Sequence, residues 1–421
     1  MSKPLYKELY EKNLEVYNSD ERIPYVGQMG DYFYNFWRDD ENPRGLWRRT
    51  TLEEYKKENP EWEIILNLDE LAEKEDENWV YKGSNCLYPT YDRCLINLSR
   101  GGADATVVRE FDIESKSFVK DGFQLPEAKS SLSWIDKDTL YVGTDFGDGS
   151  MTDSGYPRVV KVWERDQPIE KATTVFEGEK TDVSVGAYVA HDGDDKYKII
   201  YQGLDFYSRE YYLVTDKGLV KLDRPKDSSV SGIINGQLLL ELKSDWTIGD
   251  KTYQQASLLS IGIDDFIAGK KDFTEMLVPD AQTSIASVSS TKDHVLITTL
   301  KDVSSELYRY TFNDGKWSHE KVDMPDLGTL SVAGTSDEHN NFFINYQNFL
   351  TPSSLYYFDA KKDSASVLKS LPAFFDASPY KVEQKFAEAK DGTKVPYFLV
   401  MAKDTKLNGK NPTLLYGYGG F

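Results

Sequence analysis

Short runs of alternating apolar and polar residues recur along most of the chain, and turn-forming residues separate them. Alternation with a period of two is typical of β-strands, whose successive side chains point to opposite faces of a sheet. Asn235-Gly236 and Asn313-Asp314-Gly315 are examples of the separating turns. The runs predict strands over residues 32–37, 45–51, 62–66, 93–98, 106–111, 131–134, 139–143, 158–163, 198–202, 210–215, 237–242, 257–263, 294–299, 305–312, 341–345 and 354–358.

Helical spacing is found near the start of the chain. From residue 4 to about residue 20, Leu5, Leu9 and Leu14 recur among lysines and glutamates at the spacing of one helix face. A short helix is also expected from 51 to about 59, where Thr51 is placed to cap it and Glu54 follows three residues later. The remaining pattern leaves little room for long helices and predicts a mainly β protein.

Many short strands at regular spacing indicate a sandwich, a barrel or a propeller. A sandwich of about 100 residues is too small for this chain, and three separate sandwiches would need linkers that the sequence lacks. A propeller grows by adding four-stranded blades, and 357 residues from 24 to 380 give about 51 residues for each of seven blades. We expect a seven-bladed β-propeller, with six or eight blades as the alternatives.

The pattern changes near Pro379. Residues 382–389 alternate as a strand, Asp391-Gly392-Thr393 forms a hairpin turn, and a second strand is expected over 395–401. After a polar loop, residues 413–416 are apolar and are followed by glycines, which predicts a buried strand that ends in a glycine-rich turn. A strand, a hairpin, a buried strand and a glycine loop are how an α/β-hydrolase sheet begins.

Three segments resemble the prolyl oligopeptidase family of serine peptidases. They are FLTPSSLY at 349–356, KDGTKVP at 390–396 and NPTLLYGYGGF at 411–421. The resemblance implies a seven-bladed propeller that caps an α/β-hydrolase domain and an enzyme that cleaves short peptides, typically after proline. It divides the chain into an N-terminal helix on the hydrolase side (1–23), the propeller (24–380) and the start of the hydrolase domain (381–421).

The resemblance also implies two site residues. Tyr418 would give its hydroxyl to the oxyanion hole, and Phe421 would line the proline pocket. A phenolic O–H aimed at the developing oxyanion stabilises the tetrahedral intermediate, and a flat aromatic face suits the apolar proline ring. The alternative is that Tyr418 and Phe421 only pack beneath the sheet, as aromatic residues beside strands usually do, and we expect this structural role for Tyr416.

The chain lacks the catalytic groups of such an enzyme. No Gly-x-Ser-x-Gly motif occurs, and His191, His294, His319 and His339 all precede the glycine loop, so we expect each to be structural or at the surface. We therefore expect a truncated chain without the nucleophile, acid and histidine, inactive alone, whose propeller gates access to the rest of the enzyme. A stand-alone propeller that binds proteins or glycans is the alternative function.

Composition narrows the range of partners. The 421 residues carry a formal net charge of −20, which opposes binding to nucleic acid or to anionic membranes. Short peptides and the missing hydrolase segment are the expected partners of a monomer. No apolar segment resembles a signal peptide, which favours the cytoplasm, and the resemblance calls for no cofactor.

Three smaller features complete the sequence. We expect residues 145–153 to form an acidic loop and not a calcium site, because the spacing and terminal glutamate of an EF-hand are missing. The arginines beside Trp37 and Trp47 are expected to stack on aromatic rings within one blade. Cys86 and Cys94, the two cysteines, are expected to be buried thiols, with a disulfide as the alternative.

Overall fold

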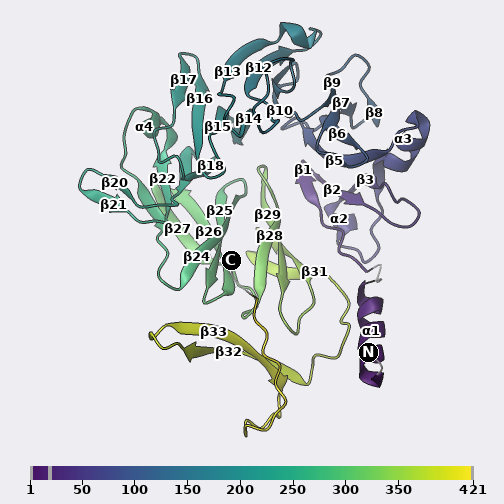
Figure 1. Cartoon of the computed structure of the whole chain (residues 1–421), viewed down its shortest axis with the longest axis vertical. Coiled ribbons are helices and arrows are strands. Elements are labelled where there is room, and N and C mark those ends of the chain that lie inside the picture. Colours follow the sequence, from purple (N-terminus) through teal and green to yellow (C-terminus); the bar gives the residue numbers. More distant parts are fainter. Residues whose placement is uncertain (1–2, 18–20, 419–421) are drawn as a thin grey trace.

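The computed structural model describes residues 3–17 and 21–418. Seven antiparallel sheets follow one another along the chain and are arranged as the blades of a ring (Figure 1). The prediction of a mainly β fold with a seven-bladed β-propeller is therefore confirmed. No helix of the described segments is long and apolar enough to cross a bilayer.

The first three blades occupy the N-terminal part of the ring. Blade 1 contains β1 (Gly27–Met29), β2 (Tyr32–Trp37), β3 (Leu46–Thr51) and β4 (Glu63–Asn67). Blade 2 contains β5 (Trp79–Cys86), β6 (Arg93–Arg100), β7 (Thr106–Asp112), β8 (Ser117–Phe118) and β9 (Gln124–Ala128). Blade 3 contains β10 (Ser131–Asp136), β11 (Thr139–Gly143), β12 (Val159–Glu164) and β13 (Thr173–Glu177).

Four further blades complete the ring. Blade 4 contains β14 (Ser184–Asp192), β15 (Asp195–Gly203), β16 (Arg209–Thr215) and β17 (Gly218–Lys221). Blade 5 contains β18 (Ser229–Ile234), β19 (Gln237–Glu241), β22 (Leu258–Gly262) and β23 (Thr274–Leu277), with β20 (Trp246–Ile248) and β21 (Lys251–Tyr253) as an inserted hairpin. Blade 6 contains β24 (Thr283–Ser290), β25 (His294–Lys301), β26 (Ser304–Asn313) and β27 (Lys316–Lys321). Blade 7 contains β28 (Thr329–Ser336), β29 (His339–Gln347), β30 (Ser354–Asp359) and β31 (Ser364–Ser370).

The helices are few and short. They are α1 (Pro4–Tyr17), α2 (Leu52–Tyr55), α3 (Leu68–Glu75), α4 (Ile263–Ile267) and one 3-10 turn, η1 (Ile169–Lys171). Thr51 caps α2 through a bond from Glu54 N, as expected, although the helix ends earlier than residue 59. Helix α3 was not predicted; its signal in the sequence is Asn67, the cap that accepts bonds from Asp69 N and Glu70 N.

The first strand of each blade lies nearest the axis. Around the ring β10 contacts β14, β14 contacts β18, β18 contacts β24, β24 contacts β28, and β28 contacts β1. Because these inner strands run in the same direction, their starting residues share one end of the propeller and the turns after them share the other. We call these the hairpin end, for the hairpin described below that contacts it, and the turn end.

Seven clusters of buried side chains hold the described part of the ring together, and each cluster joins two neighbouring blades. Strand β6 shows how the alternating pattern produces this arrangement. Ile96 and Leu98 pack against blade 1, whereas Leu95 packs against blade 3. Both faces of the blade are thus apolar, so consecutive residues of a central strand such as β6 are buried on opposite sides.

Blade 1 and blade 7 share no strand, so side chains close the ring. Phe33 and Tyr55 of blade 1 pack edge-on against Phe343 of blade 7, with ring centroids 5.8 and 5.9 Å apart. Ile23, before β1, belongs to the same buried cluster. This cluster, which we call the seam, is one of the seven blade interfaces and not a shared sheet.

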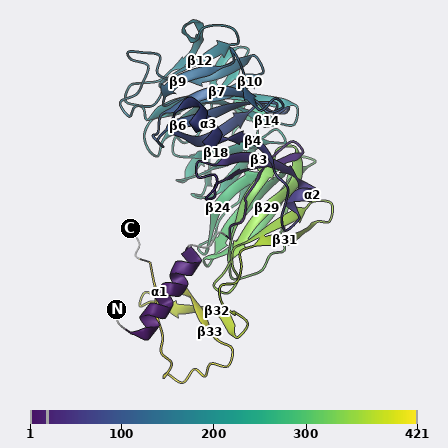
Figure 2. The same ribbon diagram turned by 90° about the vertical axis from the view of Figure 1, so that its right-hand side faces the viewer.

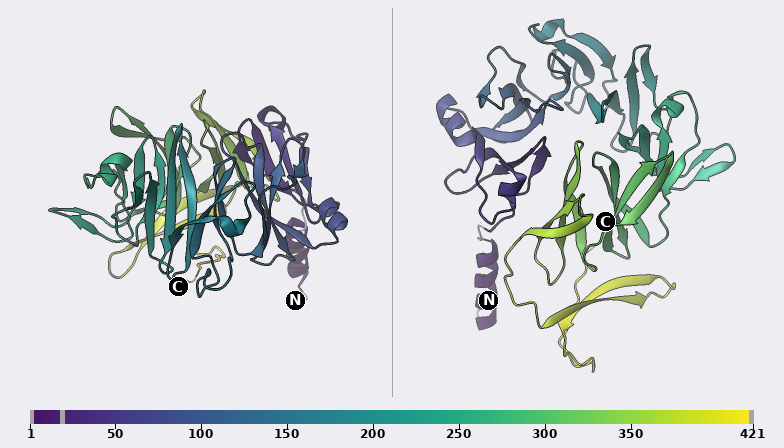
Figure 3. Two further views of the ribbon diagram at one scale, coloured as in Figure 1. Left: turned by 90° about the horizontal axis from the view of Figure 1, so that it is seen from above. Right: turned by 180° about the vertical axis from the view of Figure 1, so that it is seen from behind.

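Two elements lie outside the ring. The hairpin of β32 (Tyr380–Glu388) and β33 (Lys394–Ala402) lies beyond its rim (Figures 1 and 3). Figure 2 places α1 and this hairpin at the end of the molecule away from blades 2 and 3. No residue of α1 is buried, and Leu5, Leu9 and Leu14 of its apolar face are exposed.

Candidate functional site

The glycine-rich segment predicted to carry the site is exposed. Residues 413–418 have no regular secondary structure, and the side chains of Leu414 and Tyr418 are 91% and 79% exposed. The expected buried strand over 413–416 is therefore wrong for this structure. A strand needs a neighbouring strand to satisfy its backbone N–H and C=O groups, and among the described residues β32 and β33 pair only with each other. Phe421 lies outside the described residues.

The hairpin that precedes this segment forms as predicted. Ala389 N donates to Thr393 O at 2.8 Å, and Thr393 N donates to the Asp391 carboxylate at 3.0 Å. Gly392 takes a φ of +87°, a conformation that residues with a β-carbon rarely adopt. The Asp-Gly-Thr sequence thus sets the register in which Tyr380 faces Ala402 and Glu388 faces Lys394.

Two contacts attach the hairpin to the propeller. The Phe398 ring of β33 lies 5.5 Å from the Phe349 ring of the β29–β30 loop, and Gln384 Nε2 of β32 donates to Asp302 O in the β25–β26 turn. Loops between second and third strands lie at the end where the inner strands begin. The segment that leads to Tyr418 therefore emerges at the hairpin end of the ring.

A cavity of about 590 Å³ lies at the same end, between blades 2, 3 and 4. Ser131 and Ser184, at the starts of β10 and β14, and Asn85 of β5 place it beside the axis. Its wall is mostly polar and includes one lysine, Lys129, and one carboxylate, Asp104. The full lining is Asn85, Leu95, Asn97, Asp104, Thr106, Lys129, Ser130, Ser131, Leu132, Tyr156, Pro157, Ser184, Val185 and Tyr201.

Hydrogen bonds link successive blades at the turn end. Between blades 4 and 5, Asn235 N and Gly236 N donate to the Asp192 carboxylate at 2.9 and 2.7 Å. Between blades 6 and 7, Asp293 N donates to Asn340 Oδ1 at 2.9 Å. Between blades 7 and 1, Gly30 N donates to Glu338 at 3.2 Å. Hydrogen bonds therefore tie neighbouring turns together at three of the blade junctions.

One loop of blade 2 crosses the turn end of the propeller. The Tyr88 ring packs at a tilt against His191 of blade 4, with ring centres 4.3 Å apart, and Tyr91 lies near the carboxylate of Glu338 of blade 7. The Tyr91 ring also lies against Gly30 of blade 1. Blades 4 and 7 are each two positions from blade 2, on opposite sides, so a loop that touches both must lie over the axis. Residues 87–92 therefore bridge the turn end, whereas the cavity lies at the hairpin end.

The protonation states of the bridging side chains fit these contacts. Burial, followed by the nearby carboxylate of Glu338, raises the pKa of the Tyr91 phenol, so the phenol stays protonated. Burial, followed by Lys196, lowers the pKa of His191. A neutral imidazole is therefore favoured where His191 packs on Tyr88.

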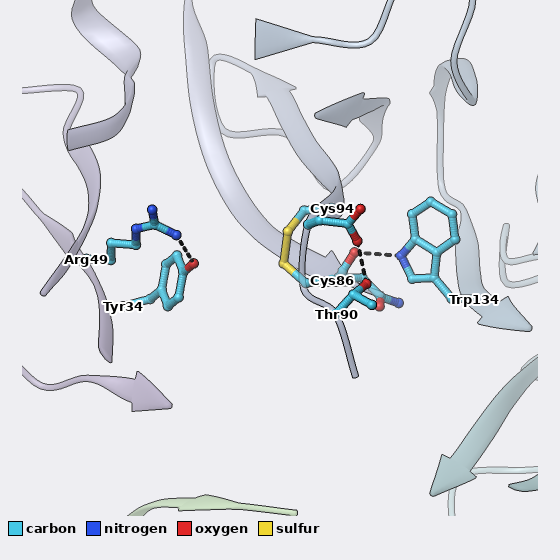
Figure 4. The surroundings of a disulfide bond; sticks show 8 residues. Tyr34, Arg49, Cys86, Thr90, Cys94 and Trp134 are labelled. Atoms are coloured by element: carbon cyan, nitrogen blue, oxygen red, sulfur yellow. Dashed lines mark hydrogen bonds between the residues drawn. A yellow bond between two sulfur atoms is a disulfide. The ribbon is translucent and has the colours of Figure 1, made fainter. Parts of the chain in front are cut away.

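A disulfide closes the base of the bridging loop. Cys86 and Cys94 are bonded (Figure 4), which corrects the expectation of buried thiols and bears out the alternative. The reason is their register: they are direct partners on β5 and β6, with Cα atoms 3.9 Å apart. Strand β5 was not predicted, so the pairing of the two cysteines did not follow from the predicted strands. Trp134 of blade 3 donates to Asn85 O beside the disulfide, at 2.9 Å.

The remaining candidates lie within the propeller. The four histidines lie in propeller strands, where His294 bonds to Thr311 at 2.9 Å and His319 stacks on Tyr310 at 4.7 Å. In the acidic loop, Gly147 N donates to Asp145 at 2.9 Å. Among residues 3–17 and 21–418, no three His, Cys, Asp or Glu side chains are placed to hold a metal ion.

The basic and aromatic strip of blade 1 is also part of the blade packing. The Arg48 guanidinium lies 4.7 Å from the Trp37 ring and 4.2 Å from the Trp62 ring. The predicted stacking within one blade is therefore confirmed.

Comparison with known proteins identifies the family. Residues 2–371 match the domain described as "Prolyl oligopeptidase, N-terminal beta-propeller domain". A protein of Sinorhizobium fredii named as an uncharacterized peptidase is 40% identical, over 99% of this chain and 59% of its own length. An uncharacterized peptidase of Rickettsia prowazekii is 32% identical, over 99% of this chain and 60% of its own length.

A solved structure gives the same result. The structure described as a post-proline cleaving enzyme from Rickettsia typhi is 30% identical and superposes with a TM-score of 0.86, covering 100% of this chain and 63% of that one. The chain thus spans about three fifths of the length of these relatives. This chain belongs to the prolyl oligopeptidase family, whose N-terminal β-propeller domain it contains.

Proposed function

We propose that this chain is the substrate-admitting part of a serine endopeptidase that cleaves short peptides after proline. Family membership supports the peptidase class, and the similarity to a post-proline cleaving enzyme supports the specificity. The observation that carries the proposal is the difference between the two ends of the ring. The segment that leads to Tyr418 leaves from the hairpin end, where a polar cavity also lies, while residues 87–92 bridge the other end.

Peptides would therefore reach the reacting centre from the hairpin end and not along the axis from the turn end. The nucleophile, acid and histidine would come from a hydrolase domain of which residues 381–421 are the start, so this chain alone would be inactive. The exposed apolar face of α1 would pack on the same domain, because an unpaired apolar helix face is stabilised by burial. Family membership does not favour a stand-alone binding module.

Tyr418 would donate its hydroxyl to the oxyanion, and Phe421 would contact the proline ring. The exposure of Tyr418 leaves its side chain accessible to a second domain. In the full-length protein we expect Tyr418→Phe to lower kcat about 10²–10³-fold with little change in KM, because the lost donor acts mainly on the transition state. A chromogenic prolyl peptide would provide the measurement.

Tyr416→Phe is the matched control, since Tyr416 is a similarly exposed tyrosine two residues earlier to which we assign no catalytic role; the expected packing of Tyr416 beneath a sheet is not seen here. Its kcat should stay near the wild-type value. A serine-reactive fluorophosphonate should label the full-length protein, whereas the 421-residue chain should remain unlabelled. Unchanged turnover in Tyr418→Phe would remove this residue from the mechanism, and an unlabelled full-length protein would contradict the peptidase assignment.

A further inference from the structure

Lys129 is the one cation on the wall of the cavity at the hairpin end. Its Nζ lies 4.4 Å from the centre of the Tyr156 ring, an arrangement that attracts a cation to the ring face and limits where the side chain points. Its ion-pair partner there is Asp104, at 3.9 Å. That distance is longer than a charge-assisted hydrogen bond, and the Asp104 side chain is 81% exposed. Such a loose surface pair contributes little, so the ammonium keeps donors for another anion.

Neutral polar groups share the cavity wall with this cation. Asn97, Ser131, Ser184 and Tyr201 line the cavity, and their side chains form no hydrogen bond with another described residue. Together they offer amide and hydroxyl donors beside one positive charge. That set matches a group with one negative charge and several acceptor sites, which is a carboxylate. A polyanion fits less well, because the whole chain carries a net charge of −20.

We propose that this cavity is a subsite for a carboxylate of the peptide, bound by Lys129. The inference rests on the proposed function, since a peptide held over the axis at the hairpin end would extend past Ser131 and Ser184 into the cavity. The carboxylate could come from the C-terminus of a short peptide or from an Asp or Glu side chain. Recognition of the C-terminus would limit how many residues follow the cleaved bond.

Direct binding to the 421-residue chain tests this site without requiring catalysis. The probes are three N-acetylated pentapeptides: Ala-Ala-Pro-Ala-Ala as the free acid, the same peptide as the carboxamide, and Ala-Ala-Pro-Glu-Ala as the carboxamide. Isothermal titration calorimetry would compare them. We expect at least one carboxylate peptide to bind about tenfold more tightly than the neutral carboxamide, the usual effect of one hydrogen-bonded charge. Tighter binding of the free acid alone identifies the C-terminus, and tighter binding of the glutamyl peptide alone identifies a side chain.

Substitutions then assign the effect to Lys129. In Lys129→Met the carboxylate preference should disappear while the carboxamide affinity stays unchanged, and Lys129→Arg should retain the preference. Asp104→Asn should strengthen it, because the competing carboxylate is removed. Lys161→Met is the matched control: Lys161 also stacks on an aromatic ring of blade 3, Phe146 at 4.1 Å, but lies outside the cavity.

Three results would overturn the proposal. They are equal affinity of wild type for all three peptides, binding of none of them, and a carboxylate preference that survives in Lys129→Met. Each concerns binding alone, so fluorophosphonate labelling of the full-length protein separates a wrong subsite from a wrong peptidase assignment.

Discussion

At the scale of single residues, Glu110 of β7 is the clearest buried charge. Its side chain is fully buried and accepts two bonds from Arg165, at 2.9 and 3.1 Å, and one from Phe123 N at 2.8 Å. Arg165 follows β12, so this pair joins blade 2 to blade 3. A buried carboxylate is tolerated only while it is paired and hydrogen-bonded.

Removing the arginine should therefore be costly. We expect Arg165→Met to lower the free energy of unfolding by about 3–5 kcal/mol, because Glu110 would remain buried without its main partner. Equilibrium urea unfolding measures this change. Adding Glu110→Gln should restore part of the loss, since no charge is then left buried. Lys270→Met breaks an exposed pair with Asp265 and should change stability by less than about 1 kcal/mol. Equal effects of Arg165→Met and Lys270→Met would contradict this account.

At the scale of elements, short apolar runs bounded by turn residues predicted many strands, because each blade buries both of its faces. Strand β2 (Tyr32–Trp37) and strand β11 (Thr139–Gly143) begin and end where the sequence indicated. Strand β5 was missed because its polar stretch, Lys82 to Asn85, interrupts the pattern near the axis. Residues 413–416 have a strand-like pattern but no pairing partner among the described residues. A strand-like sequence therefore forms a strand only where a neighbouring strand is present to pair with it.

The candidate site was less predictable than the fold. Motif resemblance singled out Tyr418, but the cavity beside Lys129 combines residues from three blades that are far apart in sequence. The bridging role of the loop with Tyr88 and Tyr91 could not be predicted, because only the closed ring brings His191 and Glu338 near it. Contacts of this kind follow from blade order and not from any local signal.

We expect the disulfide between β5 and β6 to contribute to the free energy of unfolding. A bond between cysteines separated by 8 positions closes a short loop, and the chain-entropy estimate for such a loop is about 2–3 kcal/mol. We expect the double variant Cys86→Ala/Cys94→Ala to lose this amount in urea unfolding. Dithiothreitol should lower the stability of wild type and leave the double variant unchanged. Wild type that is insensitive to the reductant would show that the disulfide contributes nothing measurable.

At the scale of the whole molecule, side-chain packing at the seam closes the ring. Phe342 and Phe343 are adjacent in β29, and both are buried, but they point to opposite faces of blade 7. Phe343 packs across the seam, whereas Phe342 packs in the interface with blade 6, where its ring stacks on Phe358 at 4.5 Å. Replacing each phenylalanine in turn therefore distinguishes the effect of ring closure from the effect of packing between two other blades.

Truncating either ring should cost about 3–5 kcal/mol, the usual range for a buried phenylalanine. The effects on local opening should differ. In Phe343→Ala we expect faster hydrogen exchange in β1 and β28, the strands that meet at the seam, and in Phe342→Ala we expect it in β25 and β26. Exchange measured by mass spectrometry distinguishes the two patterns. Identical patterns would contradict the view that the seam opens separately from the interface between blades 6 and 7.

The seam also fixes where the chain enters and leaves the ring. Ile23 and Leu371, at the two crossings, pack in the same cluster. The segments before Ile23 and after Leu371 are thus both joined to the propeller at a single edge. Two connections at one edge act as a hinge. A domain attached there could tilt and move away from the opposite edge of the propeller without stretching either connection. The cavity between blades 2, 3 and 4 lies toward that opposite edge.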